Sequence, residues 1–519
     1  MQKNKSMLQT SFARSICFLM VSVVMIAPVV WADSLAEPTV NLLRVGFAER
    51  DITPALGMEI PGGYGKAFHQ KLHDPCKVRA VVFDDGKIKA ALVGVDALMV
   101  PPHLVEAARK EIHERCAILP EAVLIGASHS HSSGPVGMVQ PGQFDWASPF
   151  VRSLAYEKSS CADAGYIERV WEEIVTAVCQ ADSNRREARC GVGSGVEDRV
   201  AFNRRFRMKN GLVFTHPGKG NPDIVGVAGP IDPQVGVIGA WSKEGNLLGC
   251  IVNYACHATT SPGGISANWI YYMEKTIRGT LGADAIVVFL QGFSGDVTQV
   301  DNLSRFAERS GEDSARFVGS RIGAEAVKVL VSIEQGALFP LDARSKVIRI
   351  KRRVPDPERV KQCADIARKD PNEVGHTEWT FAKEIVLLDA ILAKEPVAEV
   401  ETQALQVGPA LFLAAPGEMF CQFGLDLKAQ SPFPFTFPVE LANGCVGYVP
   451  TDEALGEHGG GYETRLTSYS NLVPEAGRMM CDAALELAGQ MKVGTIPTSP
   501  KAPPFQAPWS YGNVPPELK

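Results

Sequence analysis

Apolar runs rich in β-branched residues alternate with segments of helical periodicity along most of this chain, and this alternation limits the fold more than any other feature. Strands are predicted for residues 79–85, 89–99, 122–128, 247–256, 284–292 and 404–418. Helices are predicted for residues 103–116, 166–180 and 314–335. Because strands this apolar need cover on both faces, the pattern favours an α/β fold of layered mixed sheets flanked by helices.

The size and charge of the chain exclude some classes of function. It has 519 residues, of which 45% are hydrophobic and 21% charged, so it can bury a large core in one main domain. The formal net charge is -6, and the interior of the sequence holds no run of Lys or Arg that could neutralise phosphates. Nucleic acid is therefore not expected as a partner.

Residues 1–32 have the order of a secretory signal peptide. Lys3, Lys5 and Arg14 precede the apolar stretch ICFLMVSVVMIAPVV, and small residues follow it up to Ala32. A membrane anchor needs about 20 apolar residues, whereas this stretch is shorter and contains Pro28. We therefore expect cleavage near Ala32, export to the periplasm or the medium, and no stable membrane span afterwards.

The cysteines and the C-terminal residues give two further expectations. Of the twelve cysteines, Cys17 lies in the expected signal peptide, so an odd number remains and at least one stays unpaired. Export permits disulfides, but the sequence alone does not give their pairing. Residues 490–519 are rich in proline and predict an extended arm that follows the main domain.

Polar residues with catalytic potential follow several of the predicted strands. His129 and His131 come after the run at 122–128, His257 after the run at 247–256, and Glu418 ends the run at 404–418. The turn SGDVT, residues 294–298, follows the run at 284–292. Strand ends are where α/β folds place their sites, so these residues predict a metal-assisted hydrolytic site if they converge. Taken singly, each residue also fits a structural role, such as a turn cap for Asp296.

The order of several motifs resembles a known family. The segments VGFAERDITP, IPGGYG, GASHSHSSGPVG, AFNRRF, VNYACHATT, SGDVT, APGEMF and GYVPTDEA follow one another as in the N-terminal domain of the neutral/alkaline ceramidases. The resemblance spans residues 41–489, which it implies are one catalytic domain. The H-x-H-S-G-P segment and the order of the later blocks are its most specific parts.

The resemblance implies a zinc site with one ion per chain. Its ligands would be four residues that match the family pattern, namely His129, His257, Glu418 and Tyr448. His131 and Tyr462 would act in catalysis, and Arg204 would contact the substrate. Imidazole and carboxylate donors suit Zn²⁺ and leave a coordination position for water, whose pKa falls to about 7 when it is bound.

The chain also departs from the family pattern. Thr298 in GDVTQV takes the place of a serine regarded as catalytic in the family. Its hydroxyl can still donate or accept a hydrogen bond, so Thr298 is expected to act in catalysis, and its extra methyl group is expected to alter substrate choice. Residues 140–160 are expected to wall the pocket, and only the short arm is expected where ceramidases have an immunoglobulin-like domain.

The implied function is that of an exported zinc amidohydrolase that cleaves an N-acyl amide. Its substrate is expected to be a small amphiphilic or N-acylated molecule, and ceramide itself stays an open question. The alternatives are an esterase or another C–N hydrolase on the same zinc site, or a non-catalytic protein that binds lipids or glycans.

Overall fold

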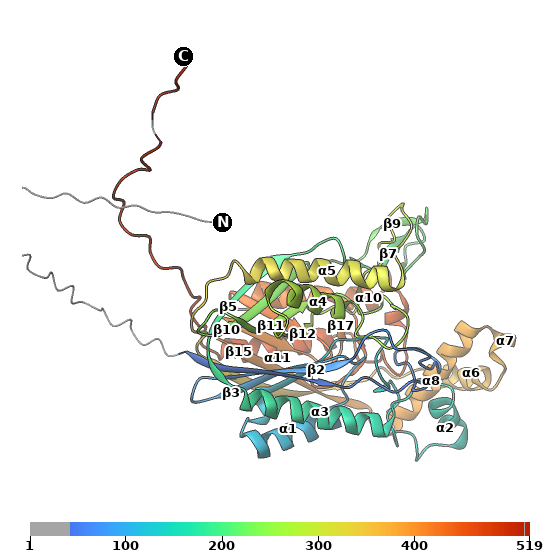
Figure 1. Ribbon diagram of the computed structural model, residues 1–519. Helices are drawn as coiled ribbons and strands as arrows, with labels where there is room; N and C mark the ends of the chain where they lie inside the picture. The colour runs from blue at the N-terminus through green and yellow to red at the C-terminus, as the bar shows by residue number, and fades with distance from the viewer. Residues whose placement is uncertain (1–41, 513) are drawn as a thin grey trace, which may run out of the picture. The chain divides into compact units, whose positions relative to one another are not determined.

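An eight-stranded mixed sheet is the main element of the computed structural model, which describes residues 42–512 and 514–519 (Figure 1). The expected signal peptide at residues 1–32 lies outside the described residues. In spatial order the strands are β12 (Ile286–Gln291), β11 (Leu247–Tyr254), β10 (Gln234–Trp241), β5 (Arg186–Val196), β1 (Leu43–Asp51), β2 (Lys77–Asp84), β3 (Lys89–Val95) and β4 (Val123–Ala127). Both edge strands, β12 and β4, run parallel to their neighbours, while the pairs between them are antiparallel.

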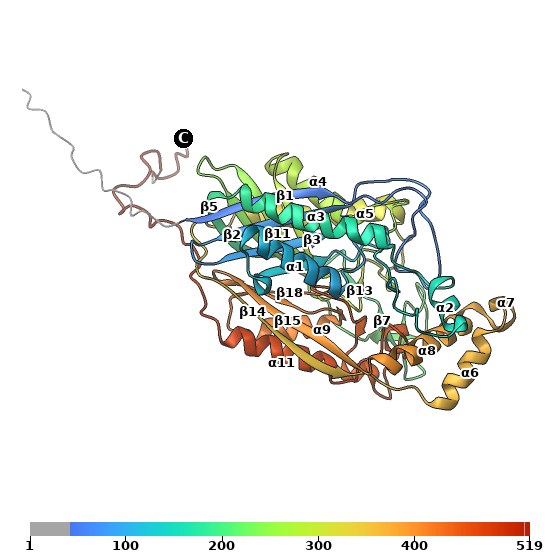
Figure 2. The ribbon, with the colours of Figure 1, turned by 90° about the horizontal axis from the view of Figure 1, so that it is seen from below.

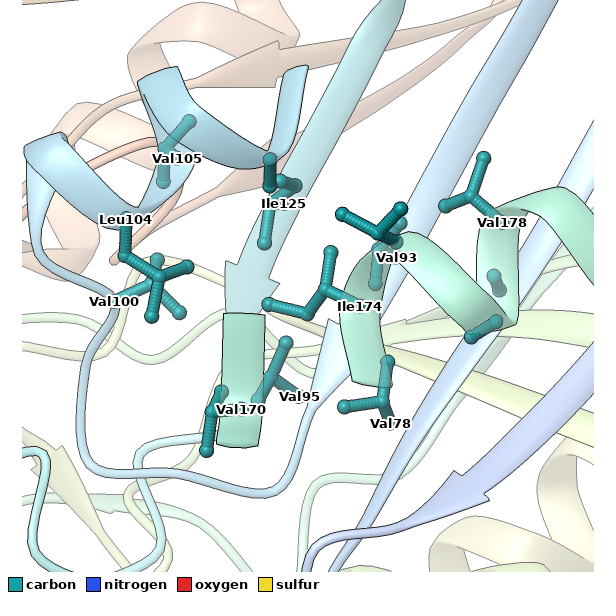
Figure 3. Close-up of a cluster of buried hydrophobic side chains, with 14 of the residues drawn as sticks. Val78, Val93, Val95, Val100, Leu104, Val105, Ile125, Val170, Ile174 and Val178 are labelled. Atoms are coloured by element: carbon teal, nitrogen blue, oxygen red, sulfur yellow. The ribbon is translucent and has the colours of Figure 1, made fainter. Parts of the chain in front are cut away.

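Two helix pairs cover the outer face of this sheet (Figure 1). Helices α1 (Pro102–Cys116) and α3 (Ala164–Ser183) lie over β1–β4, and helices α4 (Trp269–Leu281) and α5 (Gly311–Leu330) lie over β10–β12. Alternate residues of each strand point to opposite faces, so Val78 and Val82 of β2 meet α3 while Val81 and Phe83 face inward. Figure 3 shows the first of these contacts, with Val78, Val93, Val95 and Ile125 beside Val170, Ile174 and Val178.

A second, four-stranded sheet packs against the inner face of the first. Its strands are, in order, β14 (Leu341–Lys351), β15 (Val397–Val407), β16 (Ala410–Ala414) and β18 (Phe435–Val439). Phe412 and Phe437 pack there with Leu290 of β12 in a core shared by the two sheets. The outer face of this four-stranded sheet is covered by α9 (Cys421–Gln430) and α11 (Ala476–Gly489). Figure 2 shows α11 along β14 and β15.

The prediction of one strand over residues 404–418 is wrong. The chain reverses at Gly408 and Pro409, and Val407 pairs with Ala410 in an antiparallel hairpin of β15 and β16. Gly408 has a φ of 60°, a conformation that glycine adopts easily at the first position of a two-residue hairpin turn. The predicted strand at 89–99 also ends early, at Val95, because the carboxylate of Asp96 turns back to accept from the amide of Lys77.

A helical lobe stands beside the sheets. It consists of α2 (Pro149–Tyr156), α6 (Pro357–Ala367), α7 (Pro371–Val374) and α8 (His376–Lys394), which lie together in Figures 1 and 2. Helices α2, α6 and α8 share a small core of their own, which includes Phe144, Leu154 and Leu387. Helix α8 is partly buried, although the segment around it is rich in charged residues.

Short elements complete the described structure. Four strands of two residues each form two pairs. In one pair β6 (Phe202–Asn203) lies beside β13 (Val297–Thr298), and in the other β17 (Glu418–Met419) lies beside β19 (Tyr448–Val449). The others are β7 (Arg205–Met208), β8 (Val213–Thr215), β9 (Ile224–Val227), α10 (Asp452–Leu455), and the 3₁₀ turns η1 (Pro120–Ala122) and η2 (Tyr462–Thr464). The described residues after 489 adopt neither helix nor strand.

The expected fold class, layered mixed sheets flanked by helices, is confirmed by this architecture. The three predicted helices correspond to α1, α3 and α5. The described residues belong to one compact unit. Among the described residues, no helix has both the length and the apolar character needed to cross a membrane.

Candidate metal centre

The ends of four strands bring the predicted site residues together. His129 and His131 follow β4, and His257 follows β11, both in the large sheet. Glu418 and Tyr448 begin β17 and β19 and lie opposite each other in that parallel pair. His129 has a φ of 59°, a left-handed conformation that is uncommon outside glycine and that often marks a functional position.

Three imidazoles and one carboxylate form a buried cluster. Oε2 of Glu418 lies 3.3 Å from Nε2 of His129 and 3.3 Å from Nε2 of His257. Nε2 of His131 lies 3.2 Å from Nε2 of His129, and the ligand atoms of the three histidines all lie within 4.8 Å of one another. His129, His257 and Glu418 are buried, whereas His131 keeps some exposure.

Backbone carbonyls fix the orientation of two of the imidazoles. Nδ1 of His129 donates to the carbonyl of Leu98 at 2.9 Å, and Nδ1 of His257 donates to the carbonyl of Ser294 at 2.8 Å. A carbonyl can only accept, so each Nδ1 carries the proton and each Nε2 presents a lone pair toward Glu418. A histidine held in this way is the usual arrangement of a metal ligand.

Two atoms of the cluster are buried without a hydrogen bond. Nε2 of His257 and Oε2 of Glu418 have no hydrogen-bond partner among the residues that the structure describes. Such orphaned buried atoms are rare and call for a bound group. Two imidazole nitrogens and a carboxylate oxygen that converge on one point fit a divalent cation, and Zn²⁺ takes this donor set.

The pKa values of the cluster residues also favour metal binding. Burial, together with the charge of Arg204, lowers the pKa of His257 to about 3, and burial beside the other imidazoles lowers the pKa of His131 well below its usual value. Burial alone would raise the pKa of Glu418, but His129 and His257 outweigh it and hold that pKa well below its usual range. At neutral pH His131 and His257 are therefore neutral and Glu418 is charged, as metal binding requires.

Two tyrosines and an arginine adjoin the cluster. The hydroxyls of Tyr448 and Tyr462 lie 2.7 Å apart, and a guanidinium NH2 of Arg204 donates to the Tyr448 hydroxyl at 3.2 Å. Nε of Arg204 donates to Glu463 at 2.7 Å, in a pair that is almost fully buried. Burial raises the pKa of both tyrosines, so each keeps its phenolic proton at neutral pH. The structure thus brings the residues of three separate motifs to one place.

Thr298 is buried in β13 and is not among the residues that line the cavity described below. Its buried hydroxyl accepts from the amide of Val300 at 3.4 Å, and the neighbouring carbonyl of Val297 accepts from the amide of His257. No contact of this hydroxyl with an imidazole is recorded among the described residues. Asp296 has a structural role, but it joins distant segments and does not cap its own turn, since its carboxylate accepts from the amide of Cys421 and from the side chain of Asn203.

A cavity of about 350 Å³ opens beside the cluster. His129, His131, Glu418, Tyr448 and Tyr462 line one part of it. The rest is mostly apolar and comes from several segments of the chain, with Leu98, Met99, Met138, Val139, Phe381, Leu387 and Leu441 on its wall. A second cavity of about 640 Å³ adjoins the first and shares five lining residues with it, Met99, Met138, Cys445, Ser468 and Tyr469.

Several polar wall residues were not expected from the sequence. Glu384 on α8 lines the first cavity, is buried, and pairs with Nζ of Lys383 at 3.1 Å. Tyr64 and Tyr469 line it with their rings 5.7 Å apart. Residues 140–160, expected to form a wall, contribute Ser159 and Ser160. The apolar helical spacing of FAKEIVLLDAIL, residues 381–392, is the signal that could have indicated a buried face on α8.

Comparison with known proteins agrees with the resemblance seen in the motifs. No protein-family model matches the chain. The neutral ceramidase of Pseudomonas aeruginosa is 24% identical over 328 residues, which cover 60% of this chain and 45% of that protein. The matched region is thus less than half the length of that relative. The family resemblance is confirmed at this level of similarity.

Two solved structures share the fold. The crystal structure of the Pseudomonas aeruginosa neutral ceramidase aligns with a TM-score of 0.64 at 19% identity, over 89% of this chain and 76% of that one. A ceramidase complexed with C2 aligns with a TM-score of 0.63 at 18% identity, over 89% of this chain and 77% of that one. The chain therefore has the neutral ceramidase fold.

Proposed function

We propose that this chain is a zinc-dependent hydrolase that cleaves the amide bond of an N-acylated amphiphile. One zinc ion per chain would be held by His129, His257, Glu418 and Tyr448. The observation that carries the proposal is the pair of buried, unpartnered atoms, Nε2 of His257 and Oε2 of Glu418, at a point on which Nε2 of His129 also converges. The likeness to a protein named neutral ceramidase supports an amide as the bond that is cleaved.

Zinc, when bound, supplies a Lewis acid that polarises a carbonyl and lowers the pKa of water to about 7. The chain's own groups then divide the remaining work. His131 is neutral and partly exposed beside the cluster, so its imidazole can accept the proton of an attacking water and pass it to the leaving amine. The phenolic protons of Tyr448 and Tyr462 can be donated to the amide oxygen as negative charge develops there.

Arg204 would keep these tyrosines in position. Its guanidinium is fixed by Glu463 and by the carbonyl of Gly295 at 2.7 Å, and one NH2 group reaches Tyr448. A buried cation beside two phenols also stabilises negative charge on their oxygens during the reaction. Arg204 would also contact the substrate, as the family resemblance implies.

The cavities suggest how the substrate would lie. An apolar acyl chain suits the mostly apolar wall of the first cavity, since burial of each methylene group contributes about 0.8 kcal/mol. The second cavity includes charged residues, among them Arg349, Lys394 and Glu399, and suits a polar part of the same molecule. A substrate with one apolar and one polar end would use both.

Metal analysis and a matched substrate pair test the proposal. The purified full chain should hold about one zinc ion, and a chelator should remove the metal and the activity together. His257→Ala should lose both, while His458→Ala, a change at an exposed histidine, should keep both. Each N-acyl amide is assayed beside the ester of the same acyl group.

Faster ester than amide cleavage would favour the esterase alternative. Zinc binding without turnover of any amide or ester would favour a binding protein. Full zinc content in His257→Ala would overturn the proposed ligand set.

We also propose that the protein is exported to the periplasm or the medium. The order of charged, apolar and small residues in residues 1–32 supports it. N-terminal sequencing of the protein from its producing cells should begin near Asp33. A chain that retains Met1 inside the cytoplasm would contradict this proposal.

A further inference from the structure

We infer that Cys116 and Cys179 form a disulfide bond that joins helix α1 to helix α3. The two Sγ atoms lie 2.8 Å apart, well inside the separation at which two unbonded sulfur atoms pack. Their side chains therefore already point at each other in the folded chain. The inference concerns the covalent structure and does not depend on the proposed activity.

The position of the pair in the fold favours a bond that costs little strain. Cys116 is the last residue of α1, and Cys179 lies near the end of α3, where both helices cover β2, β3 and β4. Ile112, one turn before Cys116, and Val178, next to Cys179, belong to the buried core beneath the two helices. The core thus fixes the two thiols before any bond forms.

Among the described residues, no other pair of cysteines is placed to form a disulfide. They include eleven cysteines, and no other two of their sulfur atoms lie within hydrogen-bonding distance of each other. The residues that the bond would enclose run from 117 to 178 and include β4, His129 and His131. A disulfide here would therefore close a covalent loop around the segment that carries two histidines of the metal centre.

The chemistry needs an oxidant, and a small-molecule disulfide such as oxidised glutathione balances it. Sγ of Cys179, which is partly exposed, attacks one glutathione sulfur and releases the first glutathione thiol. Sγ of Cys116 then attacks Sγ of Cys179 and releases the second. The protein loses two thiol protons and two electrons, and both are recovered in the two glutathione thiols. Burial raises the pKa of Cys116 to about 12, so the second step should speed up at higher pH.

Peptide mapping tests the bond directly. The purified full chain is incubated with oxidised glutathione, denatured in the presence of an alkylating agent, and digested. We expect one cross-linked peptide pair that contains Cys116 and Cys179, with the mass of the two peptides less two hydrogen atoms. Cys363→Ser, a change at a cysteine with no sulfur neighbour among the described residues, should leave that pair intact.

Thermal unfolding gives an independent readout. Oxidised wild-type protein should melt about 4 °C above the reduced protein, since the bond joins two cysteines that are 63 positions apart in a large chain. The same difference in Cys116→Ser and in Cys179→Ser should be zero, even if these variants are less stable overall. Alkylation of both cysteines after oxidation, or a stable glutathione adduct on Cys179 alone, would overturn the inference.

Discussion

At the scale of single residues, a glycine determines how closely the chain approaches His131. Gly62 has a φ of 84°, and a Cβ atom there would lie 2.5 Å from Nδ1 of His131. Gly57 has a φ of 86° but no atom within 4 Å of such a Cβ. The two glycines thus share a backbone conformation and differ only in what lies next to them.

This contrast gives a prediction for the role of His131. Gly57→Ala should cost about 1 kcal/mol of stability through backbone strain alone. Gly62→Ala should cost at least as much and lower kcat by tenfold or more, because the methyl group displaces the imidazole. Zinc content and kcat, measured in both variants, check this. Loss of zinc in Gly62→Ala would instead make His131 a ligand.

Asp74 should make stability depend on pH in an unusual direction. It is buried, accepts from the amide of Ala267 at 2.8 Å and from the hydroxyl of Ser266, and its pKa is raised by burial to about 7. The folded protein then keeps a proton that the unfolded chain releases near pH 4. Stability from this group is therefore present below about pH 4 and is lost as the pH rises toward 7.

Asp74→Asn removes this titration and preserves the shape of the side chain. The free energy of unfolding of the variant, relative to the wild type, should rise by on the order of 3 kcal/mol between pH 4 and pH 8. Urea unfolding at a series of pH values measures it. A difference that is constant across the series would show that Asp74 titrates normally.

The family pattern implies a catalytic role for Thr298, but this residue does not line the cavity beside the histidines. If its hydroxyl acts in the reaction, Thr298→Val should lower kcat by about 10² to 10³, and Thr298→Ser should retain activity. Both variants should keep zinc, because Thr298 is not a proposed ligand. Unchanged kcat in Thr298→Val would show that the hydroxyl serves only its bond to Val300.

At the scale of elements, one buried lysine, Lys383, holds helix α8 against loops that line the cavity. Nζ of Lys383 donates to the carbonyl of Tyr64 at 2.6 Å and to the hydroxyl of Ser159 at 2.7 Å, and it pairs with Glu384. The side chain of Lys383 is fully buried. These bonds join α8 to two loops that line the same cavity.

Lys383→Met should therefore destabilise the protein by about 3–5 kcal/mol, because it leaves the carboxylate of Glu384 buried without its partner. Lys361→Met, at an exposed lysine of α6, should change stability by about 0.5 kcal/mol or less. Denaturant unfolding compares the two. Equal stability of both variants would mean that Glu384 is protonated or solvated when Lys383 is absent.

The helices and strands also show which parts of the structure can be predicted from the sequence. The long buried strands and helices were recognisable because each carries its own periodicity over many residues. The expectation that His129, His257 and Glu418 converge is met, since Glu418 lies 3.3 Å from both histidines. The strand-end rule holds for the two histidines, whereas Glu418 begins the short strand β17. Tyr448 and Arg204 came only from the resemblance, since two-residue strands such as β19 leave no pattern in a sequence.

The wall of the cavity could not be predicted in the same way. Glu384 and Tyr469 come from segments that meet the metal centre only through tertiary packing. Tyr469 has no local signal that separates it from an exposed residue. For Glu384 the local signal is its position on α8, next to a run of buried apolar residues, and this does not indicate that it faces the cavity.

At the scale of the whole molecule, the C-terminal residues divide into an attached and an exposed part. Met491 is buried, the carbonyl of Lys492 accepts from Gln406 at 2.8 Å, and the amide of Gly494 donates to Gly408 at 3.2 Å. These contacts hold the chain against the β15–β16 hairpin. Most residues from 500 onward are exposed.

Two truncations should separate these parts. A chain that ends at residue 499 should melt within about 1 °C of the full chain, because it loses few buried contacts. A chain that ends at residue 489 should melt several degrees lower, since it leaves Gln406 and an apolar surface uncovered. Differential scanning calorimetry measures both. Equal melting temperatures would mean that residues 490–499 do not stabilise the fold.

The order of the proposed ligands along the chain has a consequence for biosynthesis. His129 precedes His257, and both are made long before Glu418 and Tyr448, which lie opposite each other in β17 and β19. A growing chain therefore cannot assemble the full donor set until nearly all of it has left the ribosome. Metal binding would therefore occur only when synthesis of the protein is nearly complete. Truncated translation products would lack part of the donor set and would compete poorly for scarce zinc.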